Sequence, residues 1–221
     1  MEKRKINEYI DHTMLKPNAK YSDIKTLVNE AIENNFYSIC INPCWVKEAK
    51  TLLKNEKVKI VTVIGFPLGT NTMTSKLFEA KEMLDCGVDE IDMVQNIGKL
   101  KEGDFDYNLV EESKMAELVH RYNAKLKIII ETCLLTKEEI EKSSEICIKA
   151  GADFVKTSTG FSGEGATVQN IKFIKKIVGD KIQIKAAGGI KDFNFANSLI
   201  KAGATRLGTS SSLKILEEMN N

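Results

Sequence analysis

The sequence predicts an α/β protein that folds as a (β/α)8 barrel, the TIM-barrel architecture, with a short extra helix at the N-terminus. Eight strand-like segments alternate with eight segments that have the apolar spacing of helices, which indicates a parallel sheet covered by helices. Eight such units are the number that closes into a barrel. A doubly wound open sheet is the alternative, although such sheets usually have fewer units.

Two further observations support a single barrel. A short motif of small residues recurs before three predicted strands and fits one type of helix-to-strand turn that is used repeatedly. It lies at residues 86–89, 150–153 and 202–205. No linker, low-complexity segment or break in composition divides the 221 residues. We therefore expect residues 1–221 to form one barrel domain.

The predicted strands share apolar or β-branched centres, and Pro17 and Pro43 limit the first two. The strands cover residues 9–15, 36–41, 58–64, 89–94, 125–132, the start of 151–161, 181–186 and 205–208. The predicted helices share an apolar spacing near 3.6. After a short helix over 2–9, they cover 22–34, 43–53, 75–85, 105–122, 136–151, 171–179, 192–202 and a last segment that opens at 210–212. Ser22 and Thr136 are the expected N-caps of two helices, and Gly87 ends a third.

Composition argues against several classes of function. The formal net charge of +1 gives no electrostatic support for a nucleic-acid partner, and the apolar runs are too short to cross a membrane. The charged residues 1–5 are not followed by the apolar segment of a signal peptide, so we expect a cytoplasmic location. The five cysteines include no CxxC pair, which disfavours a disulfide framework or a zinc cluster. Neither of the two histidines lies in a recognisable nucleophile motif.

The alternation of side chains along each strand predicts a charged barrel interior. On the strand over 89–94, apolar residues take one face, so Glu90 and Asp92 take the inward face. The same reasoning directs inward the residues Lys127, Ile129, Glu131, Lys156, Gln183 and Lys185. Charges in a barrel core are costly unless they are paired, so we expect an ion network. A purely structural network is one interpretation of these residues, and a catalytic site is the other.

Lys156 is the candidate nucleophile. Asp92, Lys156 and Lys185 all lie toward the C-terminal ends of their strands, the face where barrel enzymes place active sites. Lys156 and Lys185 belong to adjacent strands, and a neighbouring cation lowers the pKa of the less well-paired ammonium group. A lysine that is activated in this way forms Schiff bases with carbonyl compounds. A lysine that carries its head to the surface at a strand end is the alternative interpretation.

Two loops have the composition of a phosphate site. Residues 187–190 and 208–212 follow the last two predicted strands, where barrels of this kind often bind phosphate. Their glycines allow close approach to an anion, and the serines at 210–212 add hydroxyl donors at the start of a helix. Simple helix capping would also explain the serines.

Together these segments resemble the deoxyribose-phosphate aldolases, a family of class I, Schiff-base aldolases with a (β/α)8 barrel. The resemblance covers nearly the whole chain, and its most specific motif is FVKTSTGF at 154–161. The other matching segments are IDHT at 10–13, ICINP at 39–43, IGFPLG at 64–69, EIDMV at 90–94, KIIIE at 127–131, IKAAGGI at 184–190 and RLGTSS at 206–211.

The resemblance implies reversible cleavage of 2-deoxy-D-ribose 5-phosphate to D-glyceraldehyde 3-phosphate and acetaldehyde, a step of deoxyribose phosphate catabolism that needs neither cofactor nor metal. It implies that Lys156 forms the Schiff base, that Asp92 serves in proton transfer and that Lys185 keeps Lys156 unprotonated. The implied substrate-pocket residues are Asp11, Cys40, Thr159 and Lys127, and the implied phosphate-binding residues are Gly160, Gly188, Gly189, Gly208, Ser210 and Ser211. Many relatives have glycine where this chain has Ser212, so the fine shape of the phosphate site is left open.

Other interpretations stay open at this point. Cys40 could equally be a small packing residue. The chain could be a phosphate-binding barrel of another reaction class, such as a sugar-phosphate isomerase or a Schiff-base synthase, or a non-catalytic phosphosugar-binding barrel. Family members are often dimers or higher assemblies, so the resemblance implies a homodimer or a higher homo-oligomer.

Overall fold

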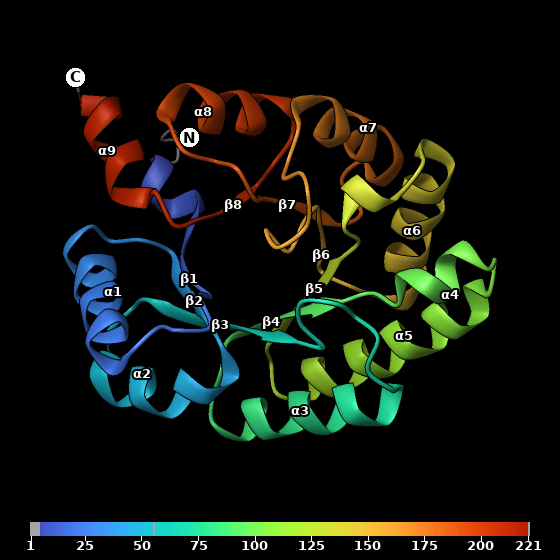
Figure 1. Ribbon diagram of the computed structural model, residues 1–221, viewed down its shortest axis with the longest axis horizontal. Coiled ribbons are helices and arrows are strands. Elements are labelled where there is room, and N and C mark those ends of the chain that lie inside the picture. Colours follow the sequence, from blue (N-terminus) through green and yellow to red (C-terminus); the bar gives the residue numbers. More distant parts are fainter. Residues whose placement is uncertain (1–4, 55, 221) are drawn as a thin grey trace.

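The strands close into one ring, as the sequence predicts (Figure 1). The structure is a computed structural model that describes residues 5–54 and 56–220. Its strands are β1 (Ile10–Met14), β2 (Ser38–Ile41), β3 (Lys59–Ile64), β4 (Glu90–Val94), β5 (Lys125–Ile129), β6 (Phe154–Lys156), β7 (Gln183–Ala187) and β8 (Arg206–Thr209). Each strand pairs in parallel with the next, and β8 pairs with β1. This last pairing makes the sheet a closed (β/α)8 barrel and excludes the doubly wound alternative.

Helices connect the strands and surround the ring (Figure 1). The α-helices are α1 (Tyr21–Glu33), α2 (Val46–Leu53), α3 (Met73–Asp85), α4 (Ile97–Lys101), α5 (Phe105–Arg121), α6 (Lys137–Ala150), α7 (Val168–Val178), α8 (Phe193–Ala202) and α9 (Ser212–Asn220). The 3-10 helices are η1 (Ile6–Tyr9), η2 (Pro43–Trp45) and η3 (Thr132–Leu134). The predicted N-terminal helix is therefore the 3-10 turn η1, and residues 2–4 of that prediction lie outside the described residues. None of the helices in the described ranges is long and apolar enough to cross a membrane.

Local signals placed most helix ends correctly. Thr136 caps α6 and forms the predicted capping box with Glu139, and Gly151 ends this helix in the left-handed conformation. The N-cap predicted at Ser22 is wrong, because α1 begins at Tyr21. The backbone N–H of Lys20 donates to the Asp23 carboxylate there, so a side chain inside the first turn replaces a cap before it.

Two features depart from the predicted elements. The predicted strand over 125–132 ends at Ile129, because Glu131 adopts the left-handed conformation with φ 51° and η3 follows it. The short helix α4 lies in the predicted loop after β4, where the Asn96 side chain accepts a hydrogen bond from the N–H of Lys99 at 3.1 Å. Both departures are at the C-terminal ends of strands, where the loops form the candidate site.

The barrel has an apolar outer layer and a divided interior. Apolar side chains on one face of each strand pack against the helices in one continuous core. On the inward face, a smaller apolar cluster comprises Leu15, Cys40, Val61 and Val63, with Phe66 packed against it. Elsewhere the interior holds charged side chains together with Phe154, whose ring lies beside Lys127 and Arg206, so different parts of the interior offer different surroundings to a bound molecule.

Candidate active site

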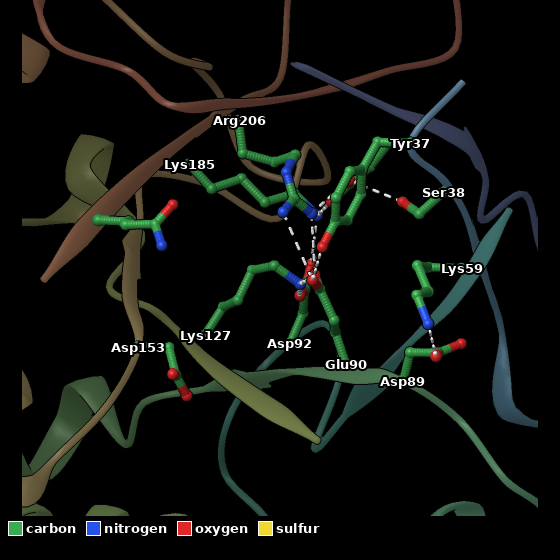
Figure 2. A network of polar contacts seen from close by, with 12 residues as sticks. Tyr37, Ser38, Lys59, Asp89, Glu90, Asp92, Lys127, Asp153, Lys185 and Arg206 are labelled. Atoms are coloured by element: carbon green, nitrogen blue, oxygen red, sulfur yellow. Dashed lines mark hydrogen bonds and ion pairs between the residues drawn. The ribbon is translucent and has the colours of Figure 1, made fainter. Parts of the chain in front are cut away.

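A network of ion pairs fills the centre of the barrel. Its members are Asp11, Glu90, Asp92, Lys127, Lys156, Lys185 and Arg206, each at most 2% exposed. Figure 2 shows Lys127, Lys185 and Arg206 converging on Asp92 and Glu90 from strands on different sides of the ring. The inward direction predicted for Glu90, Asp92 and the three lysines is thereby confirmed.

Asp92 is the central acceptor of this network. Its Oδ1 accepts a hydrogen bond from Lys127 Nζ at 2.8 Å. Its Oδ2 accepts from both Lys156 Nζ and Lys185 Nζ at 2.7 Å each. Lys156 and Lys185 also occupy paired positions on β6 and β7. The two lysine nitrogens therefore lie within twice 2.7 Å of each other, as the activation hypothesis requires.

The network contains one more base than it contains acids. Three carboxylates face four bases, so full ionisation would leave an unbalanced positive charge away from water. Burial lowers the pKa of Lys156, and although Asp92 opposes this effect, the Lys185 ammonium adds to it. For Lys185 burial also disfavours the charge, but Asp11 and Asp92 outweigh it and raise the pKa. Among the four bases, Lys156 is the one whose pKa is lowered, whereas the pKa values of Lys127, Lys185 and Arg206 are raised. Loss of a proton from Lys156 would leave equal numbers of positive and negative groups in the network.

The electrostatics of the other groups agree with this assignment. Burial would raise the pKa of Asp92, but Lys127, Lys156 and Lys185 hold it well below its usual range. Asp92 is therefore a carboxylate at neutral pH. Burial raises the pKa of Cys40, so its side chain is a neutral thiol.

A cavity of about 390 Å³ opens above Lys156 at the C-terminal ends of the strands. Lys156 is in its wall, together with Thr159 and Gly160 from the loop after β6. The loops after β7 and β8 contribute Gly188, Gly189, Gly208, Ser210 and Ser211. The cavity thus brings together the predicted nucleophile, Thr159 and all the residues predicted for the phosphate site.

Local geometry explains why the two phosphate-site loops have this sequence. Gly188 and Gly189 adopt left-handed conformations with φ 83° and 75°, which side chains other than glycine rarely adopt. The Thr209 hydroxyl donates to the carbonyl of Ile190 at 2.6 Å and accepts from the N–H of Ser211 at 2.9 Å. One side chain therefore connects the loop after β7 to the turn that begins α9, whose N-terminus favours an anion.

Three predicted pocket residues lie below the cavity and are not part of its wall. Asp11 pairs with Lys185 and Arg206 and accepts a hydrogen bond from Ser38 Oγ at 2.7 Å. Lys127 lies between Glu90 and Asp92. Cys40 packs in the inward apolar cluster. Asp11 pairs with Lys185 and Lys127 pairs with Asp92, and these two partners are also outside the cavity wall. Asp92 connects them to Lys156, which lines the cavity.

Arg206 is a network member that the sequence reasoning missed. Its guanidinium donates to Asp11 and Glu90 at 2.9 Å each, at the N-terminal end of the barrel. The signal was available, because Arg206 shares a strand face with Gly208, which the phosphate site requires to face inward. Lys16 and Lys191 also line the cavity and were not predicted.

Two loop residues, Glu131 and Gly165, have roles that the sequence reasoning did not predict. The Glu131 carboxylate accepts hydrogen bonds from the N–H and hydroxyl of Thr159 and from Ser162 Oγ, so it holds the loop that follows Lys156. Gly165 contacts the backbone of Gly188 so closely that a Cβ at Gly165 would lie 2.1 Å from the Gly188 oxygen. Neither contact has a sequence pattern, because both join loops that are far apart along the chain.

Comparisons with known proteins point to one kind of enzyme. The family model described as DeoC/LacD family aldolase matches residues 6–218. The deoxyribose-phosphate aldolase of Thermococcus kodakarensis is 51% identical over 219 residues, which is 98% of each chain. The solved structure described as QR15, an aldolase, has 41% identity and a TM-score of 0.93 over 97% of this chain and 96% of that chain. The deoxyribose phosphate aldolase of Aeropyrum pernix, described as having a unique tetrameric structure, has 31% identity and a TM-score of 0.92 over 98% of this chain and 91% of that chain.

Proposed function

The chain belongs to the DeoC/LacD family of aldolases, and from this premise we propose that it is a class I deoxyribose-phosphate aldolase. It reversibly cleaves 2-deoxy-D-ribose 5-phosphate into D-glyceraldehyde 3-phosphate and acetaldehyde through a Schiff base on Lys156. The names of the relatives described above support this choice of substrate. The geometry of this chain supplies the chemical reasons.

One observation carries the proposal: Lys156 is the surplus base of a buried network and lines the cavity. A neutral amine is a nucleophile, whereas an ammonium group is not. The amine attacks C1 of the open-chain sugar, and loss of water gives an iminium ion. Cleavage of the C2–C3 bond then leaves its electron pair on C2, where the iminium absorbs it as an enamine. Protonation of C2 and hydrolysis release acetaldehyde and return the amine.

Asp92 and Lys185 are the groups that move protons in this scheme. The hydroxyl on C3 loses a proton as the C2–C3 bond breaks, and C2 must later gain one. Asp92 Oδ2 contacts both lysine nitrogens, so it can pass a proton between them and the reacting groups. A positioned acid or base of this kind typically contributes about 10²–10⁴-fold in rate.

The two halves of the interior suit the two ends of the substrate. The glycine- and serine-rich loops give the phosphate backbone donors and the N-terminus of α9. The inward apolar cluster that includes Cys40 and Leu15 lies close enough to the lysines for their charges to affect the Cys40 thiol. An apolar wall beside C1 and C2 favours a sugar without a hydroxyl on C2, because such a hydroxyl would lose its hydrogen bonds to water.

Trapping of the Schiff base tests the proposal. Acetaldehyde and borohydride should convert Lys156 into a stable secondary amine, which peptide mass spectrometry locates. The Lys156→Ala protein should fold, form no adduct at this position and lose turnover of deoxyribose 5-phosphate. Lys59→Ala is the matched control, because Lys59 begins a barrel strand but is exposed, and it should keep both adduct and turnover. An unmodified Lys156 in folded, wild-type protein would refute the mechanism.

We also propose that the enzyme is a cytoplasmic homo-oligomer. The tetrameric description of the Aeropyrum pernix relative supports the assembly. All five cysteines are free thiols, which suits a reducing compartment. Light scattering during gel filtration tests the assembly, and a mass equal to that of one chain would contradict it.

A further inference from the structure

His12 lies outside the barrel interior and connects three elements. Side chains on β1 alternate between the two faces of the sheet, so Asp11 joins the inward ion network and His12 points outward. In the outer layer His12 packs against Phe36, with ring centroids 5.1 Å apart. Its Nε2 lies 2.8 Å from the Glu30 carboxylate on α1, and its Nδ1 lies 2.9 Å from Ser212 Oγ. The His12 side chain is only 5% exposed and its contact with Ser212 is buried, whereas Glu30 is 29% exposed, so its contact with His12 is partly buried.

The chemistry of the partners assigns the protons. A carboxylate can only accept, so Nε2 carries the hydrogen that is donated to Glu30. Burial lowers the pKa of His12 although Glu30 opposes it, so the ring is neutral and Nδ1 is an acceptor. The Ser212 hydroxyl has two possible acceptors, His12 Nδ1 at 2.9 Å and the Thr209 carbonyl at 3.3 Å, and the shorter contact is the one to Nδ1. We therefore assign its hydrogen to Nδ1, and Glu30 fixes the orientation of the ring that receives it.

Ser212 is on the reverse side of the phosphate-site turn. Ser210 and Ser211 line the cavity, whereas Ser212 is fully buried and faces His12. Ser212 is also the first residue of α9 and follows directly on Thr209, Ser210 and Ser211, which form the turn. The Thr209 hydroxyl in turn donates a hydrogen bond to the carbonyl of Ile190 in the loop after β7. A hydrogen bond that holds Ser212 thus holds the turn against β1 and α1.

We infer that His12, oriented by Glu30, is a positioning residue for phosphate binding, and that it acts through Ser212 on the turn of residues 209–211. This inference rests on the proposed function for its substrate but adds residues that touch neither the sugar nor the reacting atoms. Because the phosphate is remote from C1, loss of the contact should weaken anchoring and leave the chemistry at Lys156 intact.

The test uses variants that separate the two nitrogens of His12. An asparagine amide can replace Nδ1 and a glutamine amide can replace Nε2, so His12→Asn keeps a partner for Ser212 and His12→Gln does not. Ser212→Ala removes the hydroxyl group that contacts His12 Nδ1. His120→Gln is the matched control, because His120 also bonds a carboxylate, that of Asp153 at the start of β6, at the opposite end of the barrel.

For Ser212→Ala and His12→Gln we expect KM for deoxyribose 5-phosphate to rise about three- to tenfold, the usual cost of one buried hydrogen bond. The value of kcat, the turnover of unphosphorylated 2-deoxyribose and the acetaldehyde adduct at Lys156 should stay within twofold of the wild type. His12→Asn and His120→Gln should keep a wild-type KM. Equal KM values for Ser212→Ala and wild type, or an equal loss with both sugars, would overturn the inference.

Calorimetry with inorganic phosphate separates this inference from the proposed function. The dissociation constant of phosphate should rise by the same factor in Ser212→Ala, whether or not the protein cleaves deoxyribose 5-phosphate. Unchanged phosphate affinity in this variant would overturn the positioning role. Absence of turnover in the wild type would overturn the proposed reaction alone.

Discussion

The residue that decides the chemistry is Lys185, although Lys156 forms the proposed bond. Burial is the main cause that lowers the pKa of Lys156, and Lys185 supplies a positive charge that lowers it further and helps to balance the three carboxylates. For Lys185 itself, Asp11 and Asp92 outweigh burial and raise the pKa, so Lys185 holds its proton more strongly than Lys156 does. The reactive amine is therefore a property of the network, and a change at Lys185 should alter the titration of Lys156.

The Lys185→Met variant tests this at the level of one residue. Three carboxylates would then face three bases, so Lys156 would have to stay protonated to balance them, and its pKa would rise. Activity falls as the pH drops through the pKa of Lys156, so the active range should move to higher pH. We expect kcat/KM at neutral pH to fall about 10²-fold or more and to recover partly in alkaline buffer.

The pH profile of kcat/KM provides the measurement, with circular dichroism to confirm that the variant is folded. Lys59→Met is the control, since it removes an exposed lysine from an ion pair with Asp89 and should keep the wild-type profile. A Lys185→Met profile with its midpoint unmoved would show that Lys185 does not set the pKa of Lys156.

At the scale of elements, the site depends on contacts between loops that follow different strands. The loop after β6 returns to the loop after β7, where Ala166 N–H donates to the carbonyls of Ala187 and Gly188 at 3.0 Å. Gly165 makes this approach by lacking a side chain. The shape of the proposed phosphate site therefore depends on a residue outside the loops that are assigned to it.

The Gly165→Ala variant should distort the phosphate site. The added Cβ would meet the backbone of Gly188, which cannot move aside as a flexible side chain would. We expect KM for deoxyribose 5-phosphate to rise at least about tenfold, while acetaldehyde still forms its adduct at Lys156. Steady-state kinetics and the trapping assay measure the two effects.

Gly163→Ala is the matched control, because a Cβ at Gly163 meets nothing within 4 Å. It lies in the same loop and should leave KM unchanged. If both variants had the wild-type KM, the contact between Gly165 and Gly188 would have no part in substrate binding.

The sequence predicted elements better than their ends. Alternation identified the inward face of β4, β6 and β7, because each carries apolar residues on its outer face. It failed for Glu131, which the pattern continued as strand but which turns into the left-handed conformation. The contacts of Glu131 and Gly165 join separate loops, and periodicity along one strand carries no information about another loop.

At the scale of the whole molecule, Glu112, a buried acid outside the barrel's ion network, makes the stability of the protein depend on pH. Glu112 on α5 accepts a hydrogen bond from Gln95 Nε2 at 2.6 Å, and Gln95 accepts one from the Ser143 hydroxyl. Burial raises the pKa of Glu112 to about 8. In the unfolded chain a glutamate ionises near pH 4.3, so between these values the folded state holds a proton that the unfolded state has lost. Stability should therefore fall as the pH rises from about 4 to 8.

The Glu112→Gln variant should remove this dependence, since an amide keeps the shape of the protonated acid and does not ionise. At pH 8 we expect it to be more stable than the wild type by about 2–4 kcal/mol, at roughly 1.4 kcal/mol per pKa unit with allowance for relaxation. Urea unfolding at pH 5 and pH 8 measures the difference. Glu117→Gln, an exposed position on the same helix, is the control and should follow the wild type. If the free energy of unfolding changed equally for Glu112→Gln and wild type between pH 5 and pH 8, Glu112 would be ionised in the folded protein.

The closed ring and most of the site were predictable because both follow from repeated local patterns. Eight alternations indicated the barrel, and strand parity brought Asp92, Lys156 and Lys185 together. The second polar cluster at Glu112 was not predicted, because Gln95, Glu112 and Ser143 come from three elements and each matches an ordinary surface pattern. Arg206 was missed although its inward direction could be read from Gly208, which lies on the same face of β8.

The pairing of β1 with β8 joins the first and last strands of the chain, so the barrel can close only after the last strand has been synthesised. Asp11 leaves the ribosome early, whereas its partner Arg206 follows 195 positions later. Lys156 is also synthesised before Lys185 and before the strand that seals the cylinder. A growing or truncated polypeptide therefore carries the lysine without the surroundings that strip its proton. We therefore expect Lys156 to acquire its lowered pKa only after β7 and β8 have been added to the chain.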